Sequence, residues 1–596
     1  MNTETLVMNI GGSFLVKNES LATFYTTELK TEESIMIQEA ATQFLETEIE
    51  SNLEELESVA GIDKTPDLLK KCGDLGFLSL EVSEKYGGVN LSLKDVLHYV
   101  ESMSKGYSFA GALGVQTSIG IAPVLLYGSE YLKEQYIPKM TDGSFISAFA
   151  LTEPNAGSDA NAGKTKATIN TEGNYVINGQ KAWISNAGIA NMFIVFAKIE
   201  DDKNLSAFIV DRDFGGISFG PEEKKMGLSG WSTRQVFFEN TIVPSTHLLG
   251  ERNRGLKIAL NTLNTGRIKL GAACLGVSKL ALEHSVNYAI EREQFGKSIL
   301  EFGAMKDKIA KMTSKIFTNE AIVYRVANSI DENCEALSQS GMPFSEAKIE
   351  ALKEFSIECA IAKVYGSEAQ DFIVDESIQI YGGMGFSAES PVERLYRGAR
   401  ISRIFEGTNE INRLVIIKEF LKKGMKGEID FFSPYTKLMS DLSEPIAAFS
   451  EDTIERYEQL VDNLRFLCVL VTGVCAQQYM TQLTEEQEIA MHISDMLITV
   501  YAIESVALRI KKLKEVDKLN PEIHYPILKT IGFDCFNEME NTVKNLIACF
   551  DKKEDAKIIE QAFTKYAQLP HNNIKEARRK ICAYVEESKG VYNLSN

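Results

Sequence analysis

The chain has 596 residues, of which 44% are hydrophobic and 24% charged, a globular composition that excludes extensive disorder. Its formal net charge of −20 at pH 7 excludes sequence-independent nucleic-acid binding and argues against electrostatic docking on anionic lipid, because both need a basic surface. The length predicts several domains or one large multi-layer enzyme.

Nine cysteines and six histidines are scattered singly along the chain. This distribution is typical of buried thiols in a reducing compartment, and it indicates neither a disulfide framework nor a metal site. The first residues include acidic side chains and lack a basic segment before an apolar core, so we expect no signal peptide. The longest apolar run, 466–476, is too short to span a bilayer. We therefore expect a cytoplasmic location, with peripheral contact at the inner face of the membrane as the alternative.

The N-terminal third is predicted to be helical. Residues 1–30 lack a clear period and predict an irregular arm. Residues 31–60 predict a helix with Glu32 and Glu33 in its first turn, where the helix dipole favours acids. The stretch 94–139 is also mainly helical, so we expect a helical domain over 31–143.

A region of short β-rich runs follows Gly143. These runs predict strands over 145–151, 166–169, 175–177, 192–199, 205–211 and 235–238. The dipeptides Glu172-Gly173 and Asn178-Gly179 predict turns between them. Such spacing predicts a small antiparallel barrel or sandwich within a domain over 144–255.

Helical periodicity returns after Gly255. It predicts helices over 256–293, 301–332, 344–382 and 408–421, in a domain over 256–424. Residues 423–434 are the expected linker to a C-terminal helical extension over 435–596, which begins with a long antiparallel pair at 451–483 and 485–516 and continues with shorter helices. The predicted fold class is mostly α with a central β domain.

The stretch 403–414, RIFEGTNEINRL, carries the candidate catalytic residue. Glu406 follows two apolar residues and precedes Gly407, and Thr408 is an expected N-cap for the next helix. Desolvation there favours the protonated acid, which raises the carboxylate's affinity for a proton, as a general base requires. An ordinary helix-entry Glu is the alternative, and the peptide alone does not decide between them.

Other motifs are individually weak. The loop 151–159, LTEPNAGSD, ends a strand with hydroxyl, Gly and Asn groups that suit a flavin or a phosphate, although a decorated turn is equally compatible. Trp183 fits a cofactor platform or an ordinary core position. The peptide 291–297, EREQFGK, predicts a helix that ends at Gly296 and leaves Arg292 available for an anion. No GxGxxG motif lies between a strand and a helix, so a Rossmann domain is not indicated.

Taken together, these sequence motifs resemble those of the acyl-CoA dehydrogenase family over about residues 35–421. The resemblance rests on LTEPNAGSD, NGQKAWISNA, GWSTRQVFFEN, EREQFGK, QIYGGMGF and RIFEGTNEINRL, in that order. It is strongest toward the very-long-chain type, which has a similar helical C-terminal extension. The implied fold is helical bundle, β-barrel and helical bundle, followed by that extension.

The resemblance also implies a cofactor, FAD, and a set of binding residues. From one subunit, FAD would contact Leu151, Thr152, Ser158, Trp183, Ser185, Thr408 and Glu410. From the partner subunit, the FAD phosphates and adenosine would contact Arg292, Gln294, Phe295, Gln379 and Gly383. The acyl-CoA substrate would contact Ser158, Asn264, Arg267, Phe405 and Gly407.

In the implied reaction Glu406 removes the α-proton of the thioester and the β-hydride passes to flavin N5, which gives a trans-2-enoyl-CoA. Electrons would then pass to an electron-transferring flavoprotein, and the protein would be a homo-oligomer, in the very-long-chain relatives a dimer. Asn264 is shared with the very-long-chain type and hints at long acyl chains. Some members carry the base beside the position of Arg267, but Gly266 there cannot act as a base.

Two other functions remain open from the sequence. An acyl-CoA oxidase would use the same base and FAD and pass electrons to oxygen. A scaffold or assembly protein could keep the fold with chemistry as a secondary role. Membrane contact by the C-terminal extension also stays open, although residues 431–596 carry 19 Lys or Arg against 25 Asp or Glu.

Overall fold

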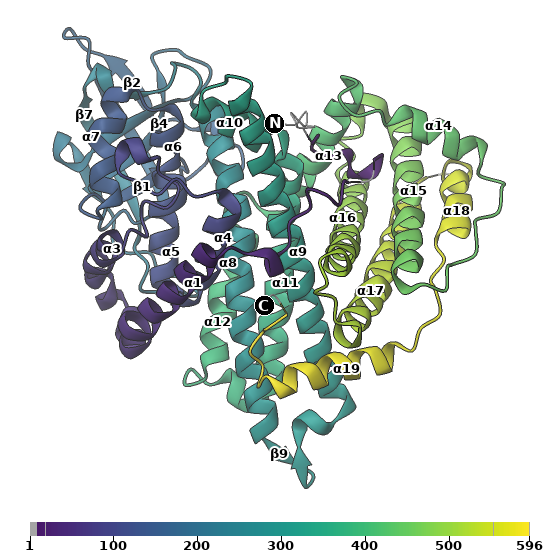
Figure 1. The fold of residues 1–596 in the computed structure, drawn as a ribbon. Helices are drawn as coiled ribbons and strands as arrows, with labels where there is room; N and C mark the ends of the chain where they lie inside the picture. Colours follow the sequence, from purple (N-terminus) through teal and green to yellow (C-terminus); the bar gives the residue numbers. More distant parts are fainter. Residues whose placement is uncertain (1–8, 18, 552, 595–596) are drawn as a thin grey trace. The chain divides into compact units, whose positions relative to one another are not determined.

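The computed structural model describes residues 9–17, 19–551 and 553–594 (Figure 1). The chain divides into two compact units. The β unit comprises 31–269 and 330–353, and the helical unit comprises the described part of 1–30 with 270–329 and 354–596. Three helices contribute residues to both units: α8 (Gly255–Glu291), α9 (Gly303–Gln339) and α10 (Phe344–Glu354).

The β unit begins with helices. They are α1 (Glu32–Phe44), α2 (Leu53–Leu56), α3 (Thr65–Asp74), α4 (Leu93–Met103), α5 (Tyr107–Val115), α6 (Ala122–Tyr127) and α7 (Glu130–Thr141). The single helix expected over 31–60 is therefore wrong after Phe44, where a π turn (Leu45–Ile49) follows. The side chains of Thr47, Ser51 and Asn52 each donate to the carbonyl four residues earlier, and such bonds compete with a regular helix.

A single eight-stranded sheet follows. Its strands are β1 (Ser147–Ala150), β2 (Lys166–Ile169), β3 (Tyr175–Ser185), β4 (Met192–Ile199), β5 (Ser206–Asp211), β6 (Ile217–Phe219), β7 (Thr233–Val243) and β8 (Leu248–Leu249). The order is β6-β7-β3-β2-β4-β5-β8, and β1 also pairs with β4. The antiparallel expectation is wrong in part, because β4 runs parallel to both β1 and β2. Short, fully buried runs such as β4 fit either direction, so their pattern carries no signal for it.

The two predicted turn dipeptides had different outcomes. Glu172-Gly173 turns the chain between β2 and β3, where Asn170 Oδ1 accepts from the N–H of Glu172 at 3.0 Å. Asn178-Gly179 is not a turn but an irregularity inside β3. A Cβ at Gly179 would lie 2.5 Å from the Thr165 hydroxyl oxygen, so glycine serves a close approach between segments there.

The helical unit is predominantly α-helical. Besides its parts of α8 and α9, it holds α11 (Ser356–Tyr381), α12 (Pro391–Ala399), α13 (Asn409–Met425), α14 (Phe432–Ser440), α15 (Thr453–Tyr479), α16 (Gln487–Glu515), α17 (Pro521–Ala548), α18 (Lys553–Tyr566) and α19 (Ile574–Glu587). A short hairpin, β9 (Glu293–Gln294) with β10 (Lys297–Ser298), follows α8. The expected long pair at 451–483 and 485–516 is confirmed as α15 and α16, but α17 is equally long rather than short.

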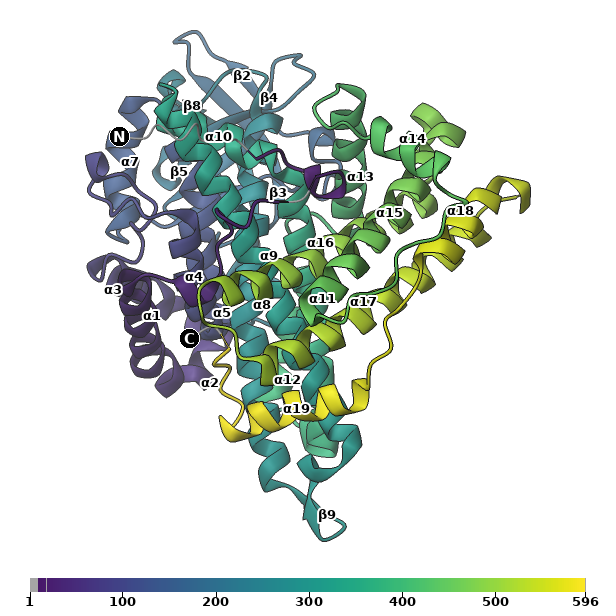
Figure 2. The same ribbon diagram turned by 45° about the vertical axis from the view of Figure 1, so that its right-hand side comes forward.

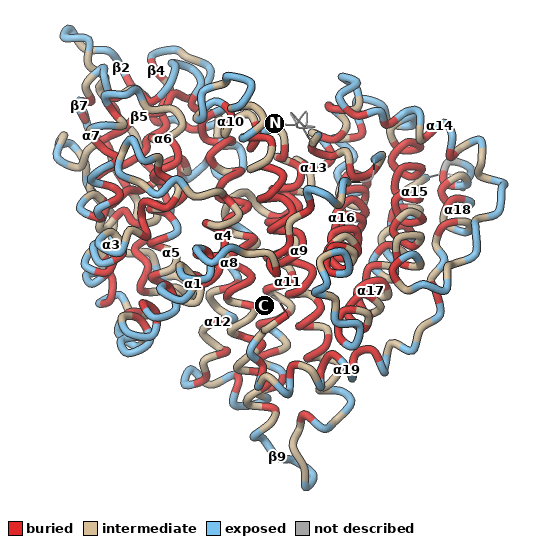
Figure 3. Tube along the Cα trace, viewed as in Figure 1, coloured by how far each residue is buried: buried red, intermediate tan, exposed pale blue. Residues whose placement is uncertain are grey.

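Long helices pack side by side in the C-terminal part of this unit. α15, α16 and α17 lie next to one another in both views (Figures 1 and 2). α16 packs against both of the others, and most of its length is buried (Figure 3). The described residues of the N-terminal arm form only 3-10 turns, but Phe14, Leu15 and Phe24 are buried. Its residues 1–8 and 18 lie outside the described residues.

Two stretches, Leu93–Tyr127 and Thr453–Gln482, are long and apolar enough to cross a membrane by length and composition. In each, most of the apolar window is buried in the protein, 61% and 78% respectively. Core helices of a folded domain pass the same test, which makes these two stretches weak evidence for membrane insertion.

Candidate active site

Glu406 stands in a short loop between a 3-10 turn, η14 (Arg400–Arg403), and α13. Its backbone is left-handed, with φ of +58°, and Gly407 follows with φ of +81°. A non-glycine residue in that region costs about 1–3 kcal/mol, so the surrounding contacts must hold it there. The expected N-cap is confirmed, since Thr408 Oγ1 accepts from the N–H of Ile411 at 3.3 Å. The Oε2 atom of Glu406 is buried.

Two fully buried side chains hold the carbonyl groups of this loop. Lys363 Nζ, from α11, donates to Gly407 O at 2.9 Å and to Asn409 Oδ1 at 2.5 Å. Asn412 Nδ2, from α13, donates to the carbonyls of Gly407 and Thr408 at 2.8 and 3.0 Å. Neither Lys363 nor Asn412 was among the predicted site residues. Lys363 gave no signal because it lies in an apolar helical run and meets Gly407 only in the fold. Asn412 could have been found, because it lies within RIFEGTNEINRL, four and five residues from its partners.

The other residues predicted around Glu406 have mixed exposure. Phe405 and Gly407 are half-buried, whereas Glu410 is exposed in the first turn of α13. Hydrogen bonds from its own backbone N–H and from Thr408 hold the pKa of Glu410 below its ordinary value. A carboxylate at this end of a helix is stabilised in its charged form.

The peptide 291–297 differs from its prediction. α8 ends at Glu291, and Phe295-Gly296 form the two-residue turn between β9 and β10, both with positive φ. Positive φ at both central positions is the geometry of a type I′ hairpin turn. The Phe295 ring is 93% exposed at the tip, and Arg292 and Gln294 are exposed beside it.

Gln379 and Gly383 lie where α11 gives way to the 3-10 turn η13 (Gly382–Phe386). Both are exposed, as are the side chains of Met384 and Phe386, the latter by 89%. The end of α11 is joined to the end of α8 by stacked rings of Tyr288 and Tyr381, whose centroids are 4.0 Å apart. The five residues predicted to act from a partner subunit are thus all exposed on the helical unit.

In the β unit, the loop after β1 is anchored by a buried ion pair. Lys181 Nζ lies 2.7 Å from Glu153 Oε1 and also donates to the carbonyl of Leu151 at 3.2 Å. Burial lowers the pKa of Lys181 to about 8, although Glu153 opposes the shift. Among the predicted residues of this loop, Leu151 is buried, Thr152 is half-buried and Ser158 is exposed.

A β-bulge in β3 decides the position of Trp183. The register of β3 against β7 shifts between Lys181 and Ile184, and Trp183 has φ of +60°. Bulges re-aim side chains, and here the indole is 59% exposed instead of lying in the core. Ser185, two residues on, is half-buried. The core alternative for Trp183 is therefore wrong.

Asn264 and Arg267 lie one turn apart on α8 and are both buried. Arg267 Nη1 donates to Asn264 Oδ1 at 3.0 Å, and Asn264 Nδ2 donates to the carbonyl of Leu352 at 3.3 Å. A buried guanidinium held by an amide is pre-oriented for an anionic or carbonyl group. Arg267 is thus a buried group of α8 and not a surface charge.

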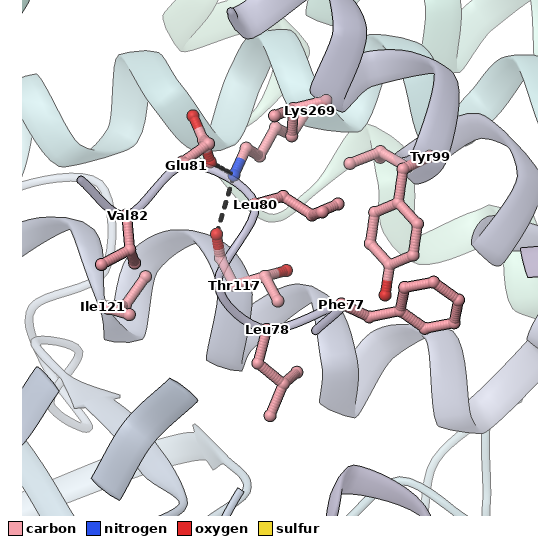
Figure 4. Close-up of a pocket in the computed structure, with 11 residues that line it drawn as sticks. Phe77, Leu78, Leu80, Glu81, Val82, Tyr99, Thr117, Ile121 and Lys269 are labelled. Carbon is pink, nitrogen blue, oxygen red and sulfur yellow. Dashed lines mark hydrogen bonds and ion pairs between the residues drawn. The ribbon is translucent and has the colours of Figure 1, made fainter. Parts of the chain in front are cut away.

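Next to them, Lys269 borders a small cavity of the β unit (Figure 4). The walls are mostly apolar: Phe77, Leu78, Leu80, Val82, Val96, Val100 and Ile121. Lys269 Nζ forms an ion pair with Glu81 and donates to the carbonyl of Thr117 at 2.7 Å. The Tyr99 hydroxyl is buried with no hydrogen-bond partner among the described residues. The cavity, about 10 Å³, has room for about one water molecule.

Comparison with known proteins agrees with this arrangement. Sequence profiles described as acyl-CoA dehydrogenase N-terminal, middle and C-terminal domains match residues 31–144, 148–241 and 253–421. A further profile, also described as an acyl-CoA dehydrogenase C-terminal domain, matches 463–565.

Individual relatives extend the match to nearly the whole chain. A probable acyl-CoA dehydrogenase of Bacillus subtilis is 36% identical over 97% of this chain and 98% of its own. The crystal structure of an acyl-CoA dehydrogenase complexed with FAD from Bacillus anthracis superposes with a TM-score of 0.94 at 38% identity, over 98% of this chain and 99% of that one.

A third relative, the human mitochondrial very long-chain specific acyl-CoA dehydrogenase, is 40% identical over 58% of this chain and 51% of its own, so the match spans about half the human protein. Together these findings confirm the predicted resemblance and fold. The chain belongs to the acyl-CoA dehydrogenase family.

Proposed function

We propose that this protein oxidises long-chain acyl-CoA thioesters to trans-2-enoyl-CoA in fatty-acid β-oxidation, with Glu406 as the base that removes the α-proton. The observation that carries the proposal is the left-handed Glu406-Gly407 loop, fixed by buried donors. A strained, over-determined backbone is typical of catalytic positions. The backbone N–H of Glu406 would donate to the thioester carbonyl and stabilise developing negative charge, a contribution of about 3 kcal/mol.

The residues present fit FAD as the cofactor. Trp183 offers an exposed flat ring, and Thr152 and Ser185 offer hydroxyl groups from neighbouring segments of the β unit. Gly383 has open space where a Cβ would lie, which permits close approach of a ligand to the backbone. Bound FAD supplies the acceptor for the β-hydride. The residues of this chain bind it, orient the thioester and move the α-proton.

The long-chain preference draws on the β unit. Asn264 and Arg267 would hold the polar part of the thioester, and the apolar side chains around the small cavity beside Lys269 would lie at the end of the acyl chain. Hydrophobic walls discriminate chain lengths only by the volume they leave. The Lys269–Glu81 ion pair is suited to close the far end of the space that holds the acyl chain, and so to limit its length. The 40% identity to a very-long-chain relative supports the same preference.

We further propose a homodimer, with an electron-transferring flavoprotein as the acceptor of electrons. The exposed rings of Phe295 and Phe386 support the dimer, because exposed apolar groups of this size can mark an interaction site. A cytoplasmic location is proposed on the singly scattered, mostly buried cysteines, with peripheral contact at the inner face of the membrane as the alternative.

The first experiment is an anaerobic titration of the purified holoprotein with acyl-CoAs of four to twenty carbons, followed by the loss of flavin absorbance. Long chains should bleach the flavin in the parent. The Glu406→Gln variant should bind them but bleach about 10²–10⁴-fold more slowly, the usual contribution of a general base. Glu419→Gln, on α13 beyond the loop, is the matched control and should bleach at the parent rate.

Two outcomes would redirect the proposal. If no acyl-CoA bleaches the flavin, or Glu406→Gln bleaches as fast as Glu419→Gln, the base is misassigned and a scaffold role gains support. Rapid oxygen consumption with palmitoyl-CoA would instead identify an oxidase.

A further inference from the structure

The loop that carries Glu406 has an unusual support inside the helical unit. Its backbone turns through two consecutive left-handed residues, and this directs the carbonyl of Gly407 toward two buried donors at once. An exposed loop would leave such a carbonyl to water. Here a fully buried ammonium, Lys363, takes that place.

Lys363 is the centre of a network that joins α11 to α13. Besides Gly407 O, it donates to Asn409 Oδ1, and Asn409 Nδ2 in turn donates to Ser367 Oγ at 3.0 Å and to Glu368 Oε1 at 2.9 Å. Glu368 also pairs with Arg413 on α13 at 2.7 Å. The cation is thereby compensated by oriented dipoles and a nearby acidic group, which makes its burial tolerable.

We propose that Lys363 is a positioning residue for catalysis: by holding the Gly407 carbonyl it keeps Glu406 left-handed and its carboxylate at the α-proton. This inference rests on the proposed role of Glu406. A glycine next to the base gives the loop freedom that must be removed, and an ammonium can donate to Gly407 O and Asn409 Oδ1 together, which an apolar side chain of equal length cannot. Lys363 touches neither substrate nor cofactor in this role.

The test compares two buried lysines of the helical unit. Lys423, like Lys363, donates to a backbone carbonyl, Gly11 O at 3.0 Å, and to a side-chain oxygen, Glu354 Oε1 at 2.7 Å, but it lies outside the Glu406 loop network. Lys363→Met and Lys423→Met therefore remove similar interactions at different places. Rapid-reaction measurements on the holoproteins give the acyl-CoA dissociation constant and the rate of flavin bleaching separately.

We expect Lys363→Met to lower the bleaching rate at saturating acyl-CoA on the order of 100-fold, as a small misplacement of a catalytic group does, with the dissociation constant changed by less than about threefold. Lys423→Met should lose similar thermal stability and bleach at the parent rate. Lys363→Arg, which keeps charge and donors, should recover part of the loss.

Should Lys363→Met fail to fold, Asn412→Asp serves instead, because it keeps the shape and replaces the donor to Gly407 O by an acceptor. The same selective loss of rate is expected. Equal bleaching rates in the parent and in either folded variant would overturn the inference, as would equal losses in Lys363→Met and Lys423→Met. A parent that no acyl-CoA bleaches would instead refute the proposed function, and the two failures are thus distinguishable.

Discussion

Two tight turns of the helical unit, the Glu406 loop and the β9–β10 hairpin, both use left-handed residues and both lie in motifs of the family. They differ in what surrounds them. The Glu406 loop is held by buried donors from α11 and α13. The hairpin ends in Phe295, whose ring is 93% exposed, beside Gly296.

This difference separates a site that the chain supports with its own side chains, the Glu406 loop, from an exposed apolar ring, Phe295, that another molecule could cover. The loop of the proposed base is held by Lys363 and Asn412, which belong to the same unit. An exposed aromatic ring at a rigid turn gains nothing in water, and such rings carry much of the energy of protein interfaces. The hairpin is accordingly expected to act on a second copy of the chain.

After the Glu406 and Lys363 variants, the largest effect is expected from breaking the hairpin. Phe295→Ser removes a predicted interface anchor. We therefore expect the dissociation constant of the dimer to rise by about 30-fold or more and FAD to be released more readily. Analytical ultracentrifugation and the flavin content after dilution would measure both. Phe344→Ser, which removes another exposed ring outside these motifs, is the control and should change neither. A dimer that survives Phe295→Ser intact would mean that the hairpin is not the interface.

The sequence identified the functional motifs better than the contacts that support them. The N-cap Thr408 and the order of helices and strands followed from local patterns, whereas Glu406 became the candidate base only through the family resemblance. Lys363 did not, because it lies in an apolar helical run and its partner Gly407 O is 44 positions further on. The alternatives for Trp183 stayed open, and the end of the helix in the peptide 291–297 was predicted wrongly, for a related reason. A β-bulge in β3 and a two-residue turn after α8 changed the local spacing of buried and exposed residues. A prediction that assumes one constant period cannot show where that spacing changes.

Sheet direction failed for a different reason. β4 is buried along nearly its whole length, so it lacks the polar-apolar alternation that would indicate a solvent-facing antiparallel strand. Its parallel pairing with β1 and β2 depends on how the chain returns after β3. That is a property of the topology, which no single strand encodes.

A smaller effect should follow from opening the cavity of Figure 4, where the chain again satisfies a charged pair internally. Replacing both partners by a small residue, Lys269→Ala with Glu81→Ala, creates volume beside the cavity and avoids leaving one charge buried alone. We expect the fastest-bleaching acyl-CoA to become longer, with a preference changed by about tenfold between neighbouring chain lengths. Lys133→Met, a change of another lysine of the β unit away from the cavity, is the control. An unchanged chain-length profile would show that the acyl chain does not reach Lys269.

The smallest effect concerns a buried group with no proposed part in catalysis, His524 near the start of α17. Its Nδ1 accepts from the N–H of Asn520 at 3.0 Å, which requires the ring to be unprotonated there. Burial, with the nearby Arg509 guanidinium, lowers the pKa of His524 to about 4. An unfolded chain, in which the ordinary pKa is about 6.5, binds more protons between these values, so the stability supplied by the neutral ring is complete above about pH 6.5 and is lost as the pH falls toward 4.

Each pKa unit of difference between the folded and unfolded chain is worth about 1.4 kcal/mol, so the free energy of unfolding should fall by about 3 kcal/mol. His524→Asn keeps an acceptor near Asn520 and cannot take up a proton, so its unfolding free energy should depend less on pH over that window, whereas the exposed His571→Asn should follow the parent curve. Denaturant unfolding at several pH values would measure the slopes. If His524→Asn and the parent lose stability in parallel, His524 is not the group that titrates. The acid sensitivity would then have to come from carboxylates paired elsewhere, such as Glu320. Burial raises the pKa of Glu320, but Lys279 and Arg509 outweigh burial and hold it at about 2.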